Sequence, residues 1–160
     1  MSEKIFHPIE PLYNEKSKIL ILGSFPSQKS REQGFFYGHP QNRFWRVLSQ
    51  IFKCDEPKTI EQKIEFLLDN EIAVWDVIKS CEIVGSSDSS IKNVVPNDIS
   101  IILNNTHIKN IYVNGKTAEK YYNKYLKDNL KIDACCLPST SPANVAWSVE
   151  QLIEAWSVIK

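Results

Sequence analysis

Four short, largely apolar runs predict strands, and the first of them has the pattern of a strand that is buried on both faces of a sheet. The first run ends at Gly23 and the third at Asn114 and Gly115, residue types that favour turns. The pattern therefore predicts four strands, each followed by a loop. The predicted strands occupy residues 18–22, 72–78, 108–113 and 132–137.

The segments between these runs carry apolar residues at helical spacing or begin with a helix-capping sequence. By contrast, residues 79–95 are rich in Gly, Ser and Asp and are predicted to form a loop. The predicted helices are residues 43–52 with Asn42 as N-cap, a segment opened by the capping box at 59–62, residues 97–103, residues 117–126, and a last helix opened by the capping box at 148–151.

Strands that alternate with helices imply right-handed crossovers, and hence a parallel sheet with helices on both faces. The sequence thus predicts the α/β class, with a three-layer α/β/α fold around a four-stranded parallel sheet. Because 160 residues suit one core, residues 1–160 are predicted to form a single domain. Ligands bind such sheets beyond the carboxyl ends of the strands, which here are the loops after Leu22, Ile78, Val113 and Leu137.

Composition agrees with a globular protein, because 42% of the residues are hydrophobic and 24% are charged. The N-terminal segment lacks the continuous apolar stretch of a secretory signal, and no run approaches the roughly 18 residues that cross a bilayer. We therefore expect an intracellular, cytoplasmic protein (nuclear in a eukaryote) that does not bind membranes. Nineteen basic and nineteen acidic residues give no net charge, which argues weakly against non-specific nucleic-acid binding. A local basic face or helix N-termini could still bind phosphates.

Residue types that bind metals do not cluster in this sequence. Cys54, Cys81, Cys135 and Cys136 form no C-x-x-C pair, so reduced thiols are expected. The segment after the first strand lacks the glycines of a dinucleotide fingerprint or a Walker loop, and no G-x-S-x-G nucleophile elbow is present. We expect no cofactor and no metal.

The three histidines differ in their predicted positions. His7 lies in the N-terminal leader and His107 just before a strand, so neither is placed like a catalytic base. His39 lies in a loop at the presumed ligand edge, where a role in chemistry and a simple hydrogen bond to backbone both remain open. A Cys81 nucleophile paired with His39 is disfavoured.

Two loops together indicate a family. The first comprises GSFPS at 23–27 and FYGHPQNRFW at 36–45, and the second is LPSTSPAN at 137–144. These segments resemble the uracil-DNA glycosylase superfamily. The HPxNRFW segment is similar to mismatch-specific uracil and thymine glycosylases, whereas GSFPS and STSPAN resemble the hypoxanthine-DNA (deoxyinosine) glycosylase branch. The resemblance covers nearly the whole chain and implies the same four-stranded parallel sheet.

The resemblance implies a metal-free, monofunctional DNA glycosylase that removes a flipped deaminated base, hypoxanthine above all, in base-excision repair. Its partner would be DNA containing such a base, and the protein would act as a monomer. A uracil or mismatch glycosylase is the alternative within the class. A catalytically inactive lesion-binding protein and a nucleoside or nucleotide hydrolase are the alternatives outside it.

The first loop departs from the mismatch glycosylases, because Phe25 stands where they carry the Asn that positions the attacking water. The resemblance to the hypoxanthine branch implies that Asn42 is catalytic instead, although a plain helix N-cap is the competing interpretation. Asp76 and Asp88 are rival carboxylates, for which a solvated or capping role is favoured. Arg43 could contact a phosphate or lie on a solvated face, and the same holds for Lys116.

The second loop departs as well. Ser139 stands where relatives place His or Asn against the leaving base, and Ala143 where some insert an apolar wedge. Ser141 matches a serine that contacts a DNA phosphate, but it could simply cap a turn at Pro142. Tyr37 matches the aromatic residue that stacks on the flipped base. The predicted sites are catalytic Asn42 and Ser139; base-binding Gly23, Ser24, Phe25, Pro26 and Tyr37; and DNA-binding Ser27, Ser141, Pro142, Ala143 and Asn144.

Overall fold

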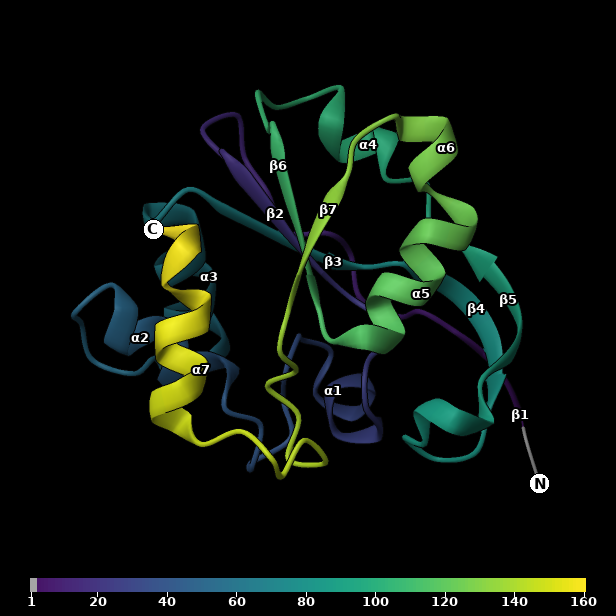
Figure 1. Ribbon diagram of the computed structural model, residues 1–160, viewed down its shortest axis with the longest axis horizontal. Helices are drawn as coiled ribbons and strands as arrows, with labels where there is room; N and C mark the ends of the chain where they lie inside the picture. Colours follow the sequence, from purple (N-terminus) through teal and green to yellow (C-terminus); the bar gives the residue numbers. More distant parts are fainter. Residues whose placement is uncertain (1–2) are drawn as a thin grey trace.

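Four parallel strands form the central sheet of the structure, a computed structural model that describes residues 3–160 (Figure 1). Their order in the sheet is β3-β2-β6-β7. Every residue of the two strands β2 and β3 is buried, as the unbroken apolar runs predict. The strands are β2 (Ile19–Gly23), β3 (Ile72–Asp76), β6 (Asn110–Asn114) and β7 (Ala134–Leu137).

Helices cover both faces of this sheet, so the predicted three-layer α/β/α fold is confirmed. Figure 1 shows α2, α3 and α7 on one side and α5 and α6 on the other. The helices are α1 (Gln28–Gln33), α2 (Phe44–Ile51), α3 (Ile60–Asp69), α4 (Ser100–Leu103), α5 (Lys116–Tyr125), α6 (Lys127–Leu130) and α7 (Val149–Trp156), with 3-10 turns η1 (Asp88–Ser90) and η2 (Ser157–Ile159).

Both predicted capping boxes are formed. The Thr59 hydroxyl accepts a hydrogen bond from the backbone N–H of Gln62 at 3.1 Å, and Ser148 accepts from Gln151 at 3.2 Å. In each box the glutamine side chain returns a bond to the N-cap backbone. These local contacts fix the first residues of α3 and α7 where the sequence predicted them.

A second, three-stranded sheet was not predicted. It is antiparallel, with the order β1-β4-β5, and consists of β1 (Glu3–Phe6), β4 (Ile78–Ile83) and β5 (Lys92–Pro96). The prediction that residues 79–95 form a loop is therefore wrong outside the turn at 84–91. The predicted strand 72–78 is also divided at Val77, whose N–H donates to the carbonyl of Gly23 at 2.8 Å. At that point the chain passes from the central sheet to the second one.

The two loops that carry the family resemblance meet at the carboxyl edge of the central sheet. Only β6 separates β2 from β7, and parallel strands end at the same edge. The N–H of Arg43, from the first loop, donates to the carbonyl of Thr140, from the second, at 3.0 Å. The predicted meeting of the two loops at this edge is thereby confirmed.

Candidate active site

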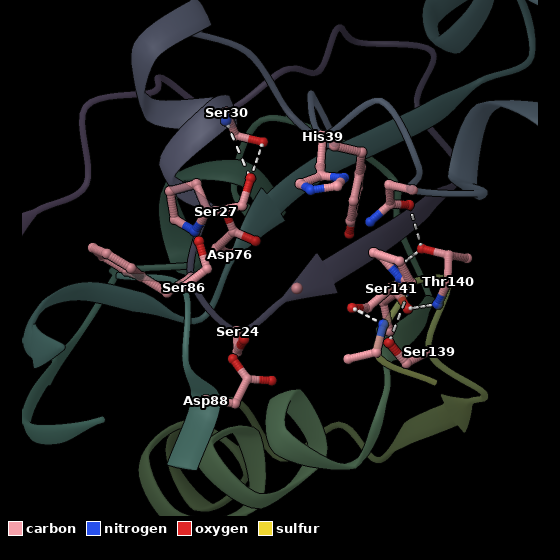
Figure 2. A pocket seen from close by; sticks show the side chains of 18 of the residues that line it. Ser24, Ser27, Ser30, His39, Asp76, Ser86, Asp88, Ser139, Thr140 and Ser141 are labelled. Atoms are coloured by element: carbon pink, nitrogen blue, oxygen red, sulfur yellow. Dashed lines mark hydrogen bonds between the residues drawn. The ribbon is translucent and has the colours of Figure 1, made fainter. Parts of the chain in front are cut away.

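The carboxyl edge of the central sheet holds a pocket of about 460 Å³, a size that admits a nucleobase (Figure 2). Both signature loops line it, together with residues 86–89 between β4 and β5. Asn144 is the one predicted site residue outside the lining. The predicted site residues that line the pocket are Gly23, Ser24, Phe25, Pro26, Ser27, Tyr37, Asn42, Ser139, Ser141, Pro142 and Ala143.

The Asn42 side chain is oriented by two hydrogen bonds to its amide oxygen. Oδ1 accepts from the backbone N–H of Phe44 at 2.9 Å and from the Thr140 hydroxyl at 2.8 Å. Because a backbone N–H can only donate, the amide oxygen must face it. The NH2 group is left without a partner in residues 3–160 and is available at the pocket. The N-cap of α2 is Arg43, so the prediction of Asn42 at that position is wrong by one residue, although the Asn42 side chain still accepts from the first N–H of the helix.

Thr140, which the sequence did not single out, links the two loops. Its buried hydroxyl donates to Asn42 and accepts from Nδ2 of Asn114 at 3.0 Å. The N–H of Thr140 in turn donates to Oδ1 of Asn114 at 3.1 Å. Asn114 ends β6, so the amide of Asn42 is held in register with the central sheet. A small polar residue between two serines carries no sequence signal of this role.

Ser139 and Ser141 each accept one backbone hydrogen bond. Ser139 Oγ accepts from the N–H of Ser141, and Ser141 Oγ accepts from the N–H of Ala143, both at 3.1 Å. The turn-capping interpretation of Ser141 is thus confirmed. Each hydroxyl proton stays available to a molecule in the pocket, because accepting a bond does not use it. Gly115, at φ +95°, permits this arrangement, since a Cβ there would lie 3.0 Å from the Cβ of Ser139.

Arg43 holds the second loop. Its guanidinium donates to the carbonyls of Ser141 at 2.8 Å, Asn144 at 3.0 Å and Trp147. Neither sequence interpretation, a phosphate contact or a solvated face, describes this side chain. A planar fork of five N–H donors suits several carbonyls at once, which explains the choice of arginine here. Asn144 adds a bond from its amide to the carbonyl of Ser139 at 2.9 Å.

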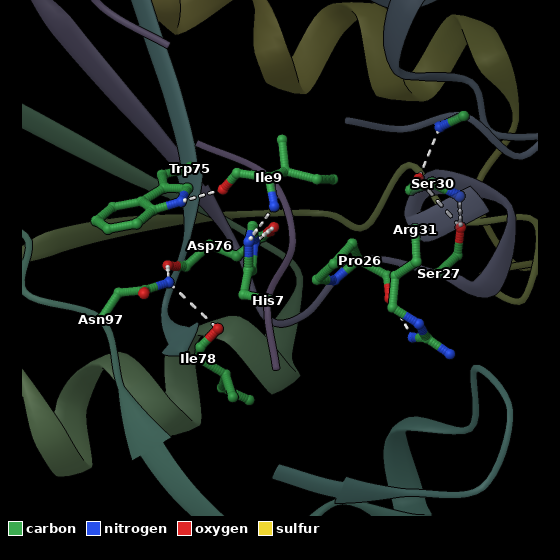
Figure 3. A network of polar contacts seen from close by, with 11 residues as sticks. His7, Ile9, Pro26, Ser27, Ser30, Arg31, Trp75, Asp76, Ile78 and Asn97 are labelled. Carbon is green, nitrogen blue, oxygen red and sulfur yellow. Dashed lines mark hydrogen bonds and ion pairs between the residues drawn. The ribbon is translucent and has the colours of Figure 1, made fainter. Parts of the chain in front are cut away.

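His7 and Asp76 form a buried pair beneath the pocket (Figure 3). Nε2 of His7 lies 2.7 Å from Oδ2 of Asp76, and the two side chains are 2% and 5% exposed. Nδ1 of His7 accepts from the N–H of Ile9 at 3.2 Å, so Nε2 is the donor to the carboxylate. The sequence assigned His7 to an N-terminal leader, whereas the structure places it directly after β1 and beside the end of β3. The solvated or capping role favoured for Asp76 is wrong, because this carboxylate is buried and bonded to His7.

The Tyr37 hydroxyl is buried and has no hydrogen-bond partner among residues 3–160. Burial, with the nearby charge of Asp76, raises its pKa, so it stays protonated. The Asn114 amide lies beside the Tyr37 hydroxyl and acts against this rise in pKa, while one of its two N–H groups donates to the Thr140 hydroxyl at 3.0 Å. The Tyr37 ring stacks on Phe44 at 4.0 Å, which leaves one ring face for the predicted stacking on a base. Its backbone adopts φ +51°, unusual for a residue with a side chain.

Gly23 brings Tyr37 and Asp76 together. A Cβ at Gly23 would lie 2.4 Å from Oδ1 of Asp76 and 3.2 Å from the Tyr37 hydroxyl. Only a residue without a side chain allows both polar atoms to approach the end of β2. The predicted base-binding role of Gly23 therefore has a steric basis.

Phe25 and Ser27 form the wall next to α1. The Phe25 ring lies edge-on to His7 at 5.9 Å between ring centroids, and the guanidinium of Arg31 lies over it at 5.5 Å. Ser27 is the N-cap of α1 and accepts from the N–H of Ser30 at 3.2 Å. Phe25 therefore contributes apolar surface where the mismatch glycosylases carry their Asn.

His39 and Asp88 line opposite parts of the pocket. Nδ1 of His39 accepts from the N–H of Gln41 at 3.1 Å, which confirms the backbone-bonded interpretation of this imidazole. Asp88 lies in the turn between β4 and β5, and although the residue as a whole is exposed, desolvation of its carboxyl group raises the pKa of that group. The Cys81 thiol does not line the pocket, and burial raises its pKa to about 11, which disfavours a nucleophilic thiolate.

Within residues 3–160, no group of three or more His, Cys, Asp or Glu side chains is arranged to hold a metal ion. The same part of the chain contains no helix of the length and apolarity needed to cross a membrane. The side chains that line the pocket carry amide, hydroxyl, carboxylate and imidazole groups.

Comparisons with known proteins agree with this geometry. The profile of the Uracil DNA glycosylase superfamily matches residues 10–160. A hypoxanthine DNA glycosylase of Methanosarcina acetivorans is 34% identical over 91% of this chain and 92% of its own length. One of Methanosarcina barkeri is 36% identical over 69% of this chain and 72% of its own. The solution NMR structure of a candidate uracil DNA glycosylase from Methanosarcina acetivorans superposes with a TM-score of 0.80, at 32% identity over 94% of both chains. The chain belongs to the uracil DNA glycosylase superfamily.

Proposed function

We propose that this protein is a monofunctional DNA glycosylase that removes hypoxanthine from deoxyinosine in DNA. The family membership and the names of the two Methanosarcina relatives support this activity. In the reaction the C1′–N9 bond breaks and its electron pair leaves with the base. A water oxygen then bonds to C1′, while the water loses one proton and the departing base gains one.

The observation that carries the proposal is the fixed orientation of Asn42. Its amide oxygen already accepts two hydrogen bonds, so the NH2 group is the part that meets the substrate. This group can hold a water by donating to its oxygen, but it cannot remove a proton. Positioning suffices when the transition state resembles an oxocarbenium ion, because the nucleophile then needs little activation. The Ser139 hydroxyl donates to the base as negative charge develops on it.

The remaining predicted residues divide between the base and the DNA backbone. Gly23, Ser24, Phe25, Pro26 and Tyr37 enclose the flipped base. Contacts to the DNA strand fall to Ser27, Ser141, Pro142, Ala143 and Asn144. The small side chain of Ala143 leaves the wedge position unfilled, and Val145, 88% exposed two residues later, is suited to fill the gap left by the base.

The proposed enzyme is a monomer formed by residues 1–160 as one DNA glycosylase domain, and it acts inside the cell without a metal or cofactor. The pocket opens at the edge of the central sheet where the two signature loops meet. Residues of one chain form its lining, so no second copy is needed to complete it. The monomeric state is supported because one chain supplies every group that the proposed mechanism uses.

Single-turnover base release tests the proposal. Otherwise identical duplexes would contain deoxyinosine, deoxyuridine, a G/T mismatch or deoxyadenosine, with free deoxyinosine nucleoside as a further substrate. We expect release of hypoxanthine to be fastest and adenine to be retained. Faster release of uracil would assign the protein to the uracil and mismatch branch. Tight binding without release would identify a lesion-binding protein, and cleavage of the nucleoside alone would identify a hydrolase.

A further inference from the structure

Thr140 lies at the centre of a hydrogen-bond relay that ends at the Asn42 amide (Figure 2). The relay begins at Asn114, the last residue of β6, and passes through Thr140 in the second loop. Asn114 Nδ2 lies 3.0 Å from the Thr140 hydroxyl, which lies 2.8 Å from Oδ1 of Asn42. A backbone N–H closes each end, that of Thr140 at Asn114 and that of Phe44 at Asn42.

The two backbone groups fix the direction of every bond in this relay. The N–H of Thr140 must meet the oxygen of the Asn114 amide, so the NH2 group of that amide faces the hydroxyl. The hydroxyl accepts there, and its own proton is left for Asn42. The N–H of Phe44 requires the amide oxygen of Asn42 at the same place. No other arrangement of the protons satisfies all of these bonds.

The relay is shielded from water at its centre, because Thr140 has no exposed surface. Its hydroxyl is therefore held by the two amides and not by solvent. Turning the Asn42 amide over would bring its NH2 group against two donors, the hydroxyl and the N–H of Phe44, at a cost that buried groups do not recover from water. Hydrogen bonds in series also polarise one another, which makes the NH2 group of Asn42 a stronger donor.

We propose that Thr140 and Asn114 are positioning residues for base release, which keep the NH2 group of Asn42 turned toward the attacking water. This inference rests on the proposed function, in which Asn42 acts on the chemical step. A reversed amide would present its oxygen, and the water would then be held through one of its hydrogens in another orientation. Thr140 and Asn114 thus act through Asn42 and not on the substrate.

A double-mutant cycle in single-turnover base release tests the relay. Thr140→Val keeps the shape of the side chain and removes the hydroxyl, and we expect it to slow release about 10- to 100-fold. In an Asn42→Ala background the same change should slow release by less than about twofold, because no amide remains to be oriented. Equal slowing in both backgrounds would overturn the proposal, since Thr140 would then act independently of Asn42.

Two further variants separate orientation from packing. Thr140→Ser keeps the hydroxyl and loses only a methyl group, so its rate should stay close to that of the parent. Thr106→Val is the matched control, because Thr106 lies outside the pocket lining and its hydroxyl donates to the carbonyl of Ile102 at 2.9 Å. We expect that control to lower the Tm and to leave the rate unchanged. A serine variant as slow as Thr140→Val would overturn the proposal.

Equilibrium binding of an uncleaved duplex separates positioning from DNA binding. Thr140→Val should leave the affinity within about twofold of the parent, because the relay acts on the chemical step. A loss of affinity as large as the loss of rate would contradict a positioning role.

Asn114→Asp tests the direction of the relay. The carboxylate still accepts from the N–H of Thr140 but cannot donate, so the hydroxyl turns its proton toward the new carboxylate and away from Asn42. Release should slow about as much as in Thr140→Val, and the double variant should be little slower than either single variant. Fully additive effects would overturn the shared relay. This variant also carries the test if Thr140→Val does not fold.

The side-chain NH2 signals of Asn42 in the NMR spectrum of the free protein give a result that does not depend on base release. Their loss in Asn42→Ala identifies them. We expect these signals to shift in Thr140→Val and Asn114→Asp and to stay in place in Thr106→Val. If the parent releases no base while the signals shift, the proposed function fails and the orientation of the amide is upheld. Unshifted signals in Thr140→Val would refute the relay.

Discussion

The His7 imidazole donates to the Asp76 carboxylate across 69 residues of sequence, at 2.7 Å and almost out of contact with solvent. The pair joins the second sheet to the central sheet directly beneath the pocket. It also decides which carboxylate oxygen remains available at the pocket floor. The stability of the fold and the chemistry of the site are therefore coupled at one hydrogen bond.

Replacing His7 should expose this coupling. His7→Ala leaves a carboxylate in a nearly buried position without its donor, so we expect unfolding free energy to fall by about 1–3 kcal/mol. His7→Gln, whose amide can still donate, should recover part of the loss. Denaturant unfolding of the three proteins provides the measurement. Equal stability of the alanine variant and the parent would show that the pair makes no net contribution to the free energy of unfolding.

Asn42→Ala should lower the single-turnover rate of base release about 100- to 1,000-fold while changing DNA affinity little. The reason is that its NH2 group acts on the chemical step. Thr59→Ala is the matched control, because it removes a helix cap from α3 far from the pocket. That variant should lose about 1 kcal/mol of stability with an unchanged rate. If Asn42→Ala also lost stability but kept the rate of the parent, Asn42 would serve only to support the start of α2.

Arg43→Lys should loosen the second loop without removing the positive charge. A lysine ammonium cannot span the three carbonyls that the guanidinium reaches. We expect faster hydrogen exchange at residues 141–147 and DNA binding weakened about 10-fold, equivalent to roughly 1.4 kcal/mol. Unaltered exchange in this segment would show that other contacts order the loop.

Gly23→Ala should disable the site while leaving the secondary structure intact. The new methyl group would overlap Oδ1 of Asp76, which His7 holds in place, and would press on the Tyr37 hydroxyl. Overpacking of this kind costs about 1–3 kcal/mol, and the displaced polar pair should also slow base release. Gly34→Ala is the comparison, since its position is open although its φ of +75° is strained. Full activity of Gly23→Ala would contradict the close approach of Asp76 and Tyr37 to Gly23.

Asp88 should make stability depend on pH in one direction. Desolvation of its carboxyl group raises the pKa above the ordinary value of 3.8, so the folded protein keeps the proton to a higher pH than the unfolded chain does. The stability that this group contributes is therefore lost as the pH rises from its pKa in the unfolded chain through its higher pKa in the folded protein. Asp88→Asn should raise the Tm relative to the parent at pH 7 and not at pH 3. A Tm difference that does not change with pH would contradict this assignment.

The sequence by itself determined the central architecture. The four apolar runs match the four strands of the central sheet, of which β2 and β3 are buried along their whole length. The capping boxes at Thr59 and Ser148 are local contacts between residues three apart. Because parallel strands all end at one edge, the sequence also located the pocket between the two signature loops. Eleven of its twelve predicted site residues line that pocket, with Asn144 supporting the loop from outside.

Only the tertiary structure decided which polar groups face the substrate. The β1-β4-β5 sheet, the His7–Asp76 pair and the Thr140–Asn42 bond join residues separated by about 69 to 98 positions or lie in segments without clear periodicity. Local hydrophobic patterns report how a segment is buried, but they contain no information on which distant segment covers it. Asp76 is an ordinary strand-terminal acid in the sequence, and it becomes a fixed acceptor in the pocket because β1 packs His7 against it.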